Sequence, residues 1–89
     1  MTGLKPVSVE LFFAAGCSKC AAARDELRAA VESSGRAQWT EIDVAREPHR
    51  AVDAGVVSTP AIAIDGELVF SSLPSVPQLQ AAIAAAAQR

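Results

Sequence analysis

The sequence predicts an α/β fold, with one domain over residues 1–89 in which helices flank a four-stranded mixed sheet. Apolar, β-branched runs alternate with helix-like segments in the order β-α-β-α-β-β-α. A helix between the first two strands indicates a parallel pair joined by a right-handed crossover. Asp65-Gly66, between the last two strands, is a strong signal for an antiparallel hairpin.

The first half of the chain predicts a strand, a helix and a second strand. Apolar residues at alternate positions within residues 5–15 indicate a mostly buried strand. From Ser18 to about Ser33, apolar residues recur at spacings of three and four, which is typical of a helix with one buried face. Gly35 suits the left-handed position after that helix. Residues 37–45 then alternate again and predict the second strand.

The second half predicts a short helix, the hairpin and a last helix. Residues 46–56 suit a helix with Pro48 in its first turn and Gly55 at its end. Ser75 is expected to cap the last helix, with Pro77 in its first turn. The larger apolar residues expected in the core are Val7, Val9, Leu11, Phe12, Phe13, Leu27, Ile42, Val44, Ile62, Ile64, Leu68, Val69, Phe70 and Ile83.

Composition and charge argue against several classes of partner. The 89 residues carry a formal net charge of −2 with no block of like charges, so a nucleic acid or an anionic membrane surface is not an expected partner. No stretch approaches the roughly 18 apolar residues of a membrane span, and no signal peptide is recognisable. A cytoplasmic location is therefore expected. In that compartment, a Cys-x-x-Cys is more often catalytic or metal-binding than a structural disulfide.

Cys17 and Cys20, the only cysteines, stand where the first strand gives way to the first helix. The unpaired amides and the positive dipole end at the start of a helix favour an anion such as a thiolate. A cysteine there can have its pKa lowered from about 8.5 toward neutrality, and Lys19 adds positive charge nearby. We expect Cys17 to attack a substrate disulfide and Cys20 to resolve the mixed disulfide.

Two other uses of the cysteines remain open. A structural disulfide would close only a very small loop. A zinc site would normally need four ligands, and beyond the two thiols the chain offers only His49, expected to be an exposed helix residue. A two-thiolate site for a soft ion such as Cu(I), in a metal carrier or sensor, is the alternative function. No metal is expected in the main interpretation.

The stretches "VELFFAAGCSKC", "WTEIDV" and "AGVVSTPAIAIDGELV" resemble the thioredoxin superfamily, especially its small glutaredoxin-like members. The resemblance runs from about Val7 to Ile83. It implies a thioredoxin-like fold and a thiol–disulfide oxidoreductase that carries electrons through a redox-active disulfide, without a bound cofactor. It also implies that the Thr59-Pro60 bond is cis. Thr59, Pro60 and Gly16 would then line the groove that receives a protein disulfide substrate.

Departures from the family pattern bear on the electron donor. Thioredoxins bury an aspartate six positions before the first cysteine, where this chain has Leu11, so Glu10 or water would have to accept the proton of Cys20. The segment "SSLPSVP" stands where glutaredoxins have a Gly-Gly and acidic residues before the last helix. The parts that would clasp glutathione are thus missing. A flavoprotein of the thioredoxin-reductase type is the expected donor, and the protein is expected to be a monomer.

Overall fold

A computed structural model of the chain describes residues 6–14 and 20–88. The sheet has four strands in the order β2-β1-β3-β4. The strands are β1 (Val7–Phe13), β2 (Ala37–Asp43), β3 (Ala61–Ile64) and β4 (Glu67–Phe70). The helices are α1 (Cys20–Ser34), α2 (Pro48–Ala54) and α3 (Val76–Ala87). The predicted order of elements is confirmed, and so is the mixed sheet, because β1 is parallel to β2 and antiparallel to β3.

Local signals in the sequence fix most element boundaries. Gly55 ends α2 with a φ of 83°, a left-handed conformation that glycine adopts without steric cost. The β3–β4 turn has φ angles of 52° at Asp65 and 86° at Gly66, as a tight primed hairpin turn requires. Ser75 caps α3, where its side chain accepts a hydrogen bond from the Gln78 amide and the Gln78 side chain accepts one from the Ser75 amide.

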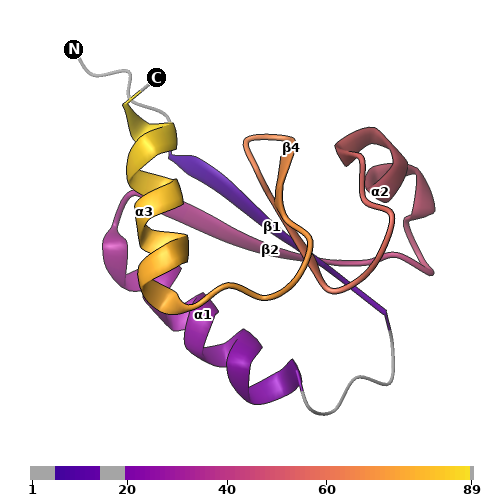
Figure 1. Ribbon diagram of the computed structural model, residues 1–89, viewed down its shortest axis with the longest axis horizontal. Helices are drawn as coiled ribbons and strands as arrows, with labels where there is room; N and C mark the ends of the chain where they lie inside the picture. The colour runs from indigo at the N-terminus through magenta and orange to yellow at the C-terminus, as the bar shows by residue number, and fades with distance from the viewer. Residues whose placement is uncertain (1–5, 15–19, 89) are drawn as a thin grey trace.

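The two faces of the sheet carry separate apolar clusters. Helices α1 and α3 cover one face, while α2 lies against the other (Figure 1). The larger cluster consists of Val7, Val9, Leu11, Leu27, Val31, Ile62, Ile64, Leu79, Ile83 and Ala86. The smaller cluster consists of Phe12, Ile42, Ala51, Ala61 and Ala63. This division follows from the period of two along β1, which sends Leu11 and Phe12 to opposite faces.

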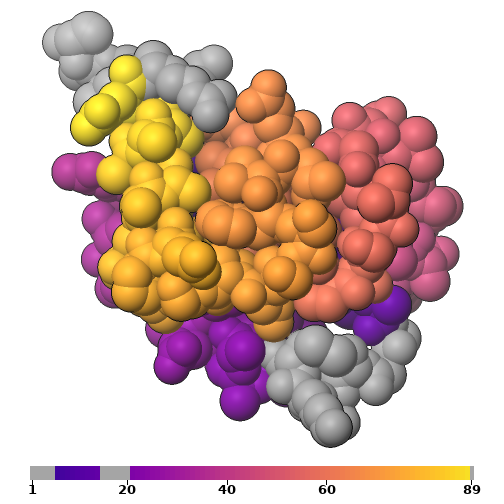
Figure 2. Space-filling model, in the orientation of Figure 1, coloured from indigo at the N-terminus to yellow at the C-terminus, as the bar shows by residue number. Residues whose placement is uncertain are grey.

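The predicted core is confirmed in most of its members but not in all. Val69 is 43% exposed, because the β3–β4 pairing shifts register there: Leu68 pairs with Ala63 and Phe70 with Ile62, which leaves Val69 as an extra residue on β4. Leu79, which is fully buried, was not among the expected core residues. Figure 2 shows α3 and the segment that follows β4 packed side by side, and Leu73 of that segment contacts the larger cluster.

The helix predicted from Ser18 is described from Cys20 onward, so its predicted first residues lie outside the described part of the chain. Among the described residues, no helix combines the length and the apolar character needed to cross a membrane.

Candidate active site

Cys17 belongs to the connection between β1 and α1, and Cys20 is the first residue of α1. β1 ends at Phe13 and α1 begins at Cys20, whose backbone alone is described. Gly16, Cys17 and Lys19, which the sequence places in the site, lie outside the described residues. Their roles therefore stay predictions. The structure describes what flanks this connection, which is the end of the central strand β1 and the start of the long helix α1.

Thr59 and Pro60 reach the same end of the sheet. The peptide bond between them is cis, as the resemblance implies, and both residues are half-buried. Pro60 leads directly into β3, and Ala61, the first residue of β3, pairs with Phe12 near the end of β1. Because these strands are antiparallel, the chain enters β3 beside the point where it leaves β1. The structure thus places Thr59 and Pro60 beside the end of β1, the strand from which the chain continues into residues 15–19.

The segment that precedes Pro60 contains an exposed apolar residue, Val57, that the sequence did not predict to be exposed. Val56 is half-buried and packs against the smaller cluster, whereas Val57 is 91% exposed. Two adjacent valines give no indication of which one faces the core. The position of Val57, three residues before Pro60, places an apolar side chain on the surface beside the candidate groove.

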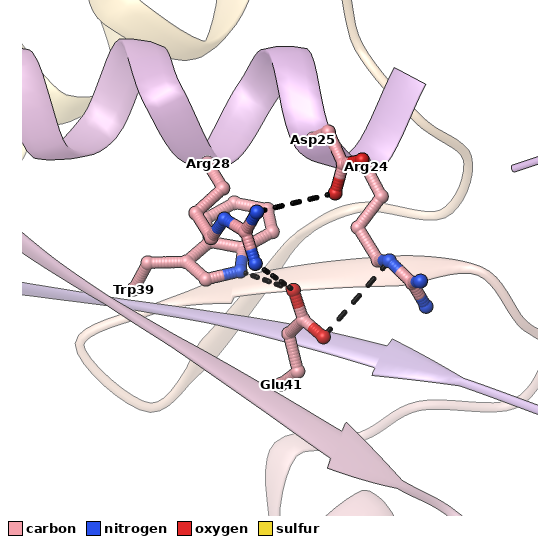
Figure 3. Close-up of polar contacts among 5 residues, drawn as sticks. All are labelled: Arg24, Asp25, Arg28, Trp39 and Glu41. Atoms are coloured by element: carbon pink, nitrogen blue, oxygen red, sulfur yellow. Dashed lines mark hydrogen bonds and ion pairs between the residues drawn. The ribbon is translucent and has the colours of Figure 1, made fainter. Parts of the chain in front are cut away.

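Charged residues of α1 meet a carboxylate of β2 on the face that carries the larger cluster (Figure 3). Arg24 Nε lies 3.9 Å from Glu41 Oε1, and Arg28 Nη1 lies 3.9 Å from Glu41 Oε2. Arg28 also forms an ion pair with Asp25 at 3.3 Å. The Trp39 indole donates a hydrogen bond of 2.8 Å to Glu41 Oε2. Together these contacts attach α1 to β2 and fix the orientation of the carboxylate.

Arg24 also contacts the last residue of β1. The guanidinium carbon lies 5.6 Å from the centre of the Phe13 ring, a distance at which a cation is attracted to an aromatic face. Arg24 therefore reaches from the first turns of α1 toward the ends of both β1 and β2. The sequence analysis missed this residue, and the available signal was its spacing of four from Cys20.

Glu10 is not placed to serve the dithiol from the α1 face of the sheet, which corrects one expectation. It alternates with Leu11 along β1, so its side chain lies on the α2 face, whereas Leu11 belongs to the larger cluster beneath α1. There Glu10 accepts a hydrogen bond from Arg50 of α2 and forms an ion pair with it. The carboxylate that faces α1 from a position beside Leu11 is Glu41, because these two residues are register partners on β1 and β2.

Comparison with known proteins identifies the fold family. The family model of the thioredoxin domain matches residues 7–84. The chain belongs to the thioredoxin domain family. A comparison with curated protein sequences found no match.

Solved structures agree with this assignment. Thioredoxin-2 of the malaria parasite is 24% identical with a TM-score of 0.74, over 90% of this chain and 82% of that chain. Mitochondrial thioredoxin 3 of Saccharomyces cerevisiae is 20% identical with a TM-score of 0.70, over 91% of this chain and 79% of that chain. A protein disulfide oxidoreductase of Aeropyrum pernix is 26% identical with a TM-score of 0.75, over 97% of this chain but only 40% of that chain.

Family membership indicates the class of chemistry of this thioredoxin domain. Thioredoxin-family proteins act on protein disulfides, and the family indicates a thiol–disulfide oxidoreductase. Within residues 6–14 and 20–88, no group of three or more His, Cys, Asp or Glu side chains could hold a metal ion. His49 is exposed on α2, as expected.

Proposed function

We propose that this thioredoxin domain reduces disulfide bonds in proteins through Cys17 and Cys20. The main support is the pairing of Ala61 with Phe12, which brings the Thr59-Pro60 segment beside the end of β1, and Cys17 follows that strand in the sequence. A substrate chain lying along that segment could offer its disulfide to a sulfur at the end of β1. Thr59 would contact such a chain through its backbone, as in other complexes in which an extended peptide pairs with a strand-like edge.

The proposed reaction has two exchange steps. The Cys17 thiolate attacks one sulfur of the substrate disulfide; a Cys17–substrate S–S bond forms, and the other substrate sulfur leaves as a thiolate. Cys20 then loses its proton to water and attacks the Cys17 sulfur. The Cys17–Cys20 bond forms as the mixed disulfide breaks, and the second substrate sulfur leaves with its electron pair. Two electrons pass from the domain to the substrate.

The electron donor in this proposal is a flavoprotein of the thioredoxin-reductase type, which reduces the Cys17–Cys20 disulfide after each cycle. The basis is the stretch from Ser71 to Pro77, which leads into the first turn of α3 and lacks the Gly-Gly and acidic residues of glutaredoxins. We further propose that the domain acts as a monomer in the cytoplasm, where the reducing environment suits a dithiol that must be regenerated.

Reduction of insulin disulfides tests the function. We expect the wild-type domain to reduce insulin when NADPH and a thioredoxin reductase are supplied, and to do so more slowly with glutathione and glutathione reductase. Cys17→Ser should abolish reduction because it removes the attacking sulfur. Cys20→Ser should instead accumulate a mixed disulfide that mass spectrometry detects. Equal activity of the wild type and Cys17→Ser would refute the proposal.

A further inference from the structure

Arg24 is a cation that its described partners satisfy only in part. Its Nε is buried and has no hydrogen-bond partner among the described residues. The separation of 3.9 Å from Glu41 Oε1 is an ion-pair distance and is too long for a hydrogen bond. The other oxygen of Glu41 accepts the Trp39 N–H and faces Arg28. Within residues 6–14 and 20–88, this guanidinium N–H thus has no acceptor, in a place where water does not reach it.

Two anchors direct this cation toward the start of α1. Phe13 holds the guanidinium from the end of β1, and Glu41 holds it from β2 (Figure 3). Both strands run parallel and end at the side of the sheet where residues 15–19 lead into α1. The side chain of Arg24 therefore lies between Phe13, the last residue of β1, and Glu41 of β2.

Arg24 shares a stripe of α1 with position 20. Leu27 and Val31 are buried on the face of α1 that packs on the sheet. Counted back from them, Arg24 and position 20 fall on the same face, at spacings of three, four and seven residues. Residues four apart on a helix have Cβ atoms about 5–6 Å from each other. The positive charge of Arg24 therefore belongs to a residue one helical turn after position 20, on the same face of α1.

Two other charged side chains that could act on position 20, those of Arg28 and Glu10, already have ion-pair partners. Arg28 is divided between Asp25 and Glu41, and it lies a further turn away from position 20. Glu10 lies on the opposite face of the sheet with Arg50. Asp43, two residues after Glu41 on β2, accepts a hydrogen bond from the Ala45 amide. Of the described residues on α1 and β2, Arg24 is the cation nearest in sequence to position 20, and Glu41 is the anion paired with it.

We propose that Arg24 promotes the second exchange step by stabilising the Cys20 thiolate as it forms, and that Glu41 both positions Arg24 and moderates its charge. This inference rests on the proposed function. Arg24 takes up no proton: Cys20 gives its proton to water, and the guanidinium stabilises the remaining negative charge. The same attraction stabilises the reduced dithiol relative to the disulfide, so Arg24 makes the domain a weaker reductant.

The reaction of the reduced domain with one equivalent of the aromatic disulfide DTNB separates the two exchange steps. Attack by Cys17 releases one coloured thionitrobenzoate ion, and attack by Cys20 on the resulting mixed disulfide releases a second. The loss of a unit positive charge one helical turn from position 20, in a partly exposed site, predicts that Arg24→Gln slows the second phase about threefold to tenfold. The pH midpoint of that phase should rise, because the thiolate has lost a stabilising cation, while the first phase changes less.

Matched variants distinguish charge from structure. Arg24→Lys should recover most of the second-phase rate because it keeps the charge. Arg28→Gln removes the same charge from the same ion-pair cluster one turn further along, and it should leave both phases near the wild-type rates. Glu41→Gln should speed the second phase and lower its pH midpoint, since the opposing charge is gone. Far-ultraviolet circular dichroism checks that each variant is folded.

Each outcome bears on one of the two proposals. Equal second phases in Arg24→Gln and Arg28→Gln would overturn the role of Arg24, and so would a slower second phase in Glu41→Gln with an unchanged pH midpoint. If Arg24→Gln fails to fold, the sign of the Glu41→Gln effect still decides. Absence of the first phase in the wild type would overturn the proposed function itself, and this inference with it.

Discussion

At the scale of single residues, Glu10 and Arg50 form the polar contact between β1 and α2. The Glu10 side chain is only 14% exposed, whereas that of Arg50 is 40% exposed. Arg50 forms a second ion pair with Glu47, at 3.6 Å. The Glu47 side chain is more exposed than that of Glu10. The two ion pairs therefore differ in burial, and they are expected to differ in their contribution to stability.

Arg50→Gln should lower the free energy of unfolding by about 1–2 kcal/mol, because it leaves the mostly buried Glu10 carboxylate without its cation. Urea titration followed by circular dichroism measures the change. Glu47→Gln is the control, and it should cost less than about 0.5 kcal/mol because that pair is solvated. Equal costs in the two variants would mean that the Glu10–Arg50 contact adds nothing beyond an ordinary surface pair.

Side-chain contacts of this kind could not be predicted from the sequence. Glu10 and Glu41 both stand in strands, and a carboxylate in a strand gives no sign of which face it occupies or which cation it meets. The ion pair of Arg24 and Glu41 joins residues 17 positions apart, and no periodicity marks it. By contrast, the cis Thr59-Pro60 bond was predictable, because a Thr-Pro pair at the start of a strand is visible in the sequence and is part of the resemblance to the thioredoxin superfamily.

At the scale of elements, capping and turn residues determined where the segments begin and end. Ser75, Gly55 and Asp65-Gly66 were recognised correctly because each acts through its own backbone conformation or through residues three or four away. Burial was harder to predict. Val69 was expected in the core because it is apolar, yet it is the unpaired residue where the β3–β4 register shifts, and it faces solvent. Leu79 was overlooked within an alanine-rich helix, although it is the largest fully buried side chain of α3.

Ser75→Ala should destabilise the domain by about 0.5–2 kcal/mol, because one amide in the first turn of α3 loses the oxygen that caps it. Thermal unfolding monitored at 222 nm would show a lower midpoint. Ser72→Ala, an exposed serine of the same connection, should leave the midpoint nearly unchanged. A midpoint for Ser75→Ala as high as that of the wild type would show that Gln78 or water replaces the cap without loss.

At the scale of the whole molecule, the larger cluster joins both long helices to all four strands. It draws its side chains from α1, α3, β1 and β3, with Trp39 of β2 and Phe70 of β4 packed at its margins. A residue at its centre therefore contributes to the contacts of several elements at once. Leu79, with no exposed surface, is such a residue.

Leu79→Ala should lower the free energy of unfolding by about 2–5 kcal/mol, because the truncated side chain leaves a cavity that its neighbours cannot close completely. Val69→Ala, at an exposed apolar site, should change it by less than about 0.5 kcal/mol. Chemical denaturation of the two variants gives the comparison. A similar small loss in both would indicate that the larger cluster repacks freely around position 79.

Few contacts hold α2 against the sheet, so this helix is expected to open locally in the native state. Ala51 is the one buried residue of this short helix, and Arg50 supplies its ion pair to the sheet. Amide protons of α2 should therefore exchange with deuterium through a partial opening that leaves the α1–α3 side intact. The chain runs from α2 into Thr59-Pro60, the segment along which we propose a substrate chain lies. Such openings would therefore loosen this segment while the amides of the α1–α3 side remain protected from exchange.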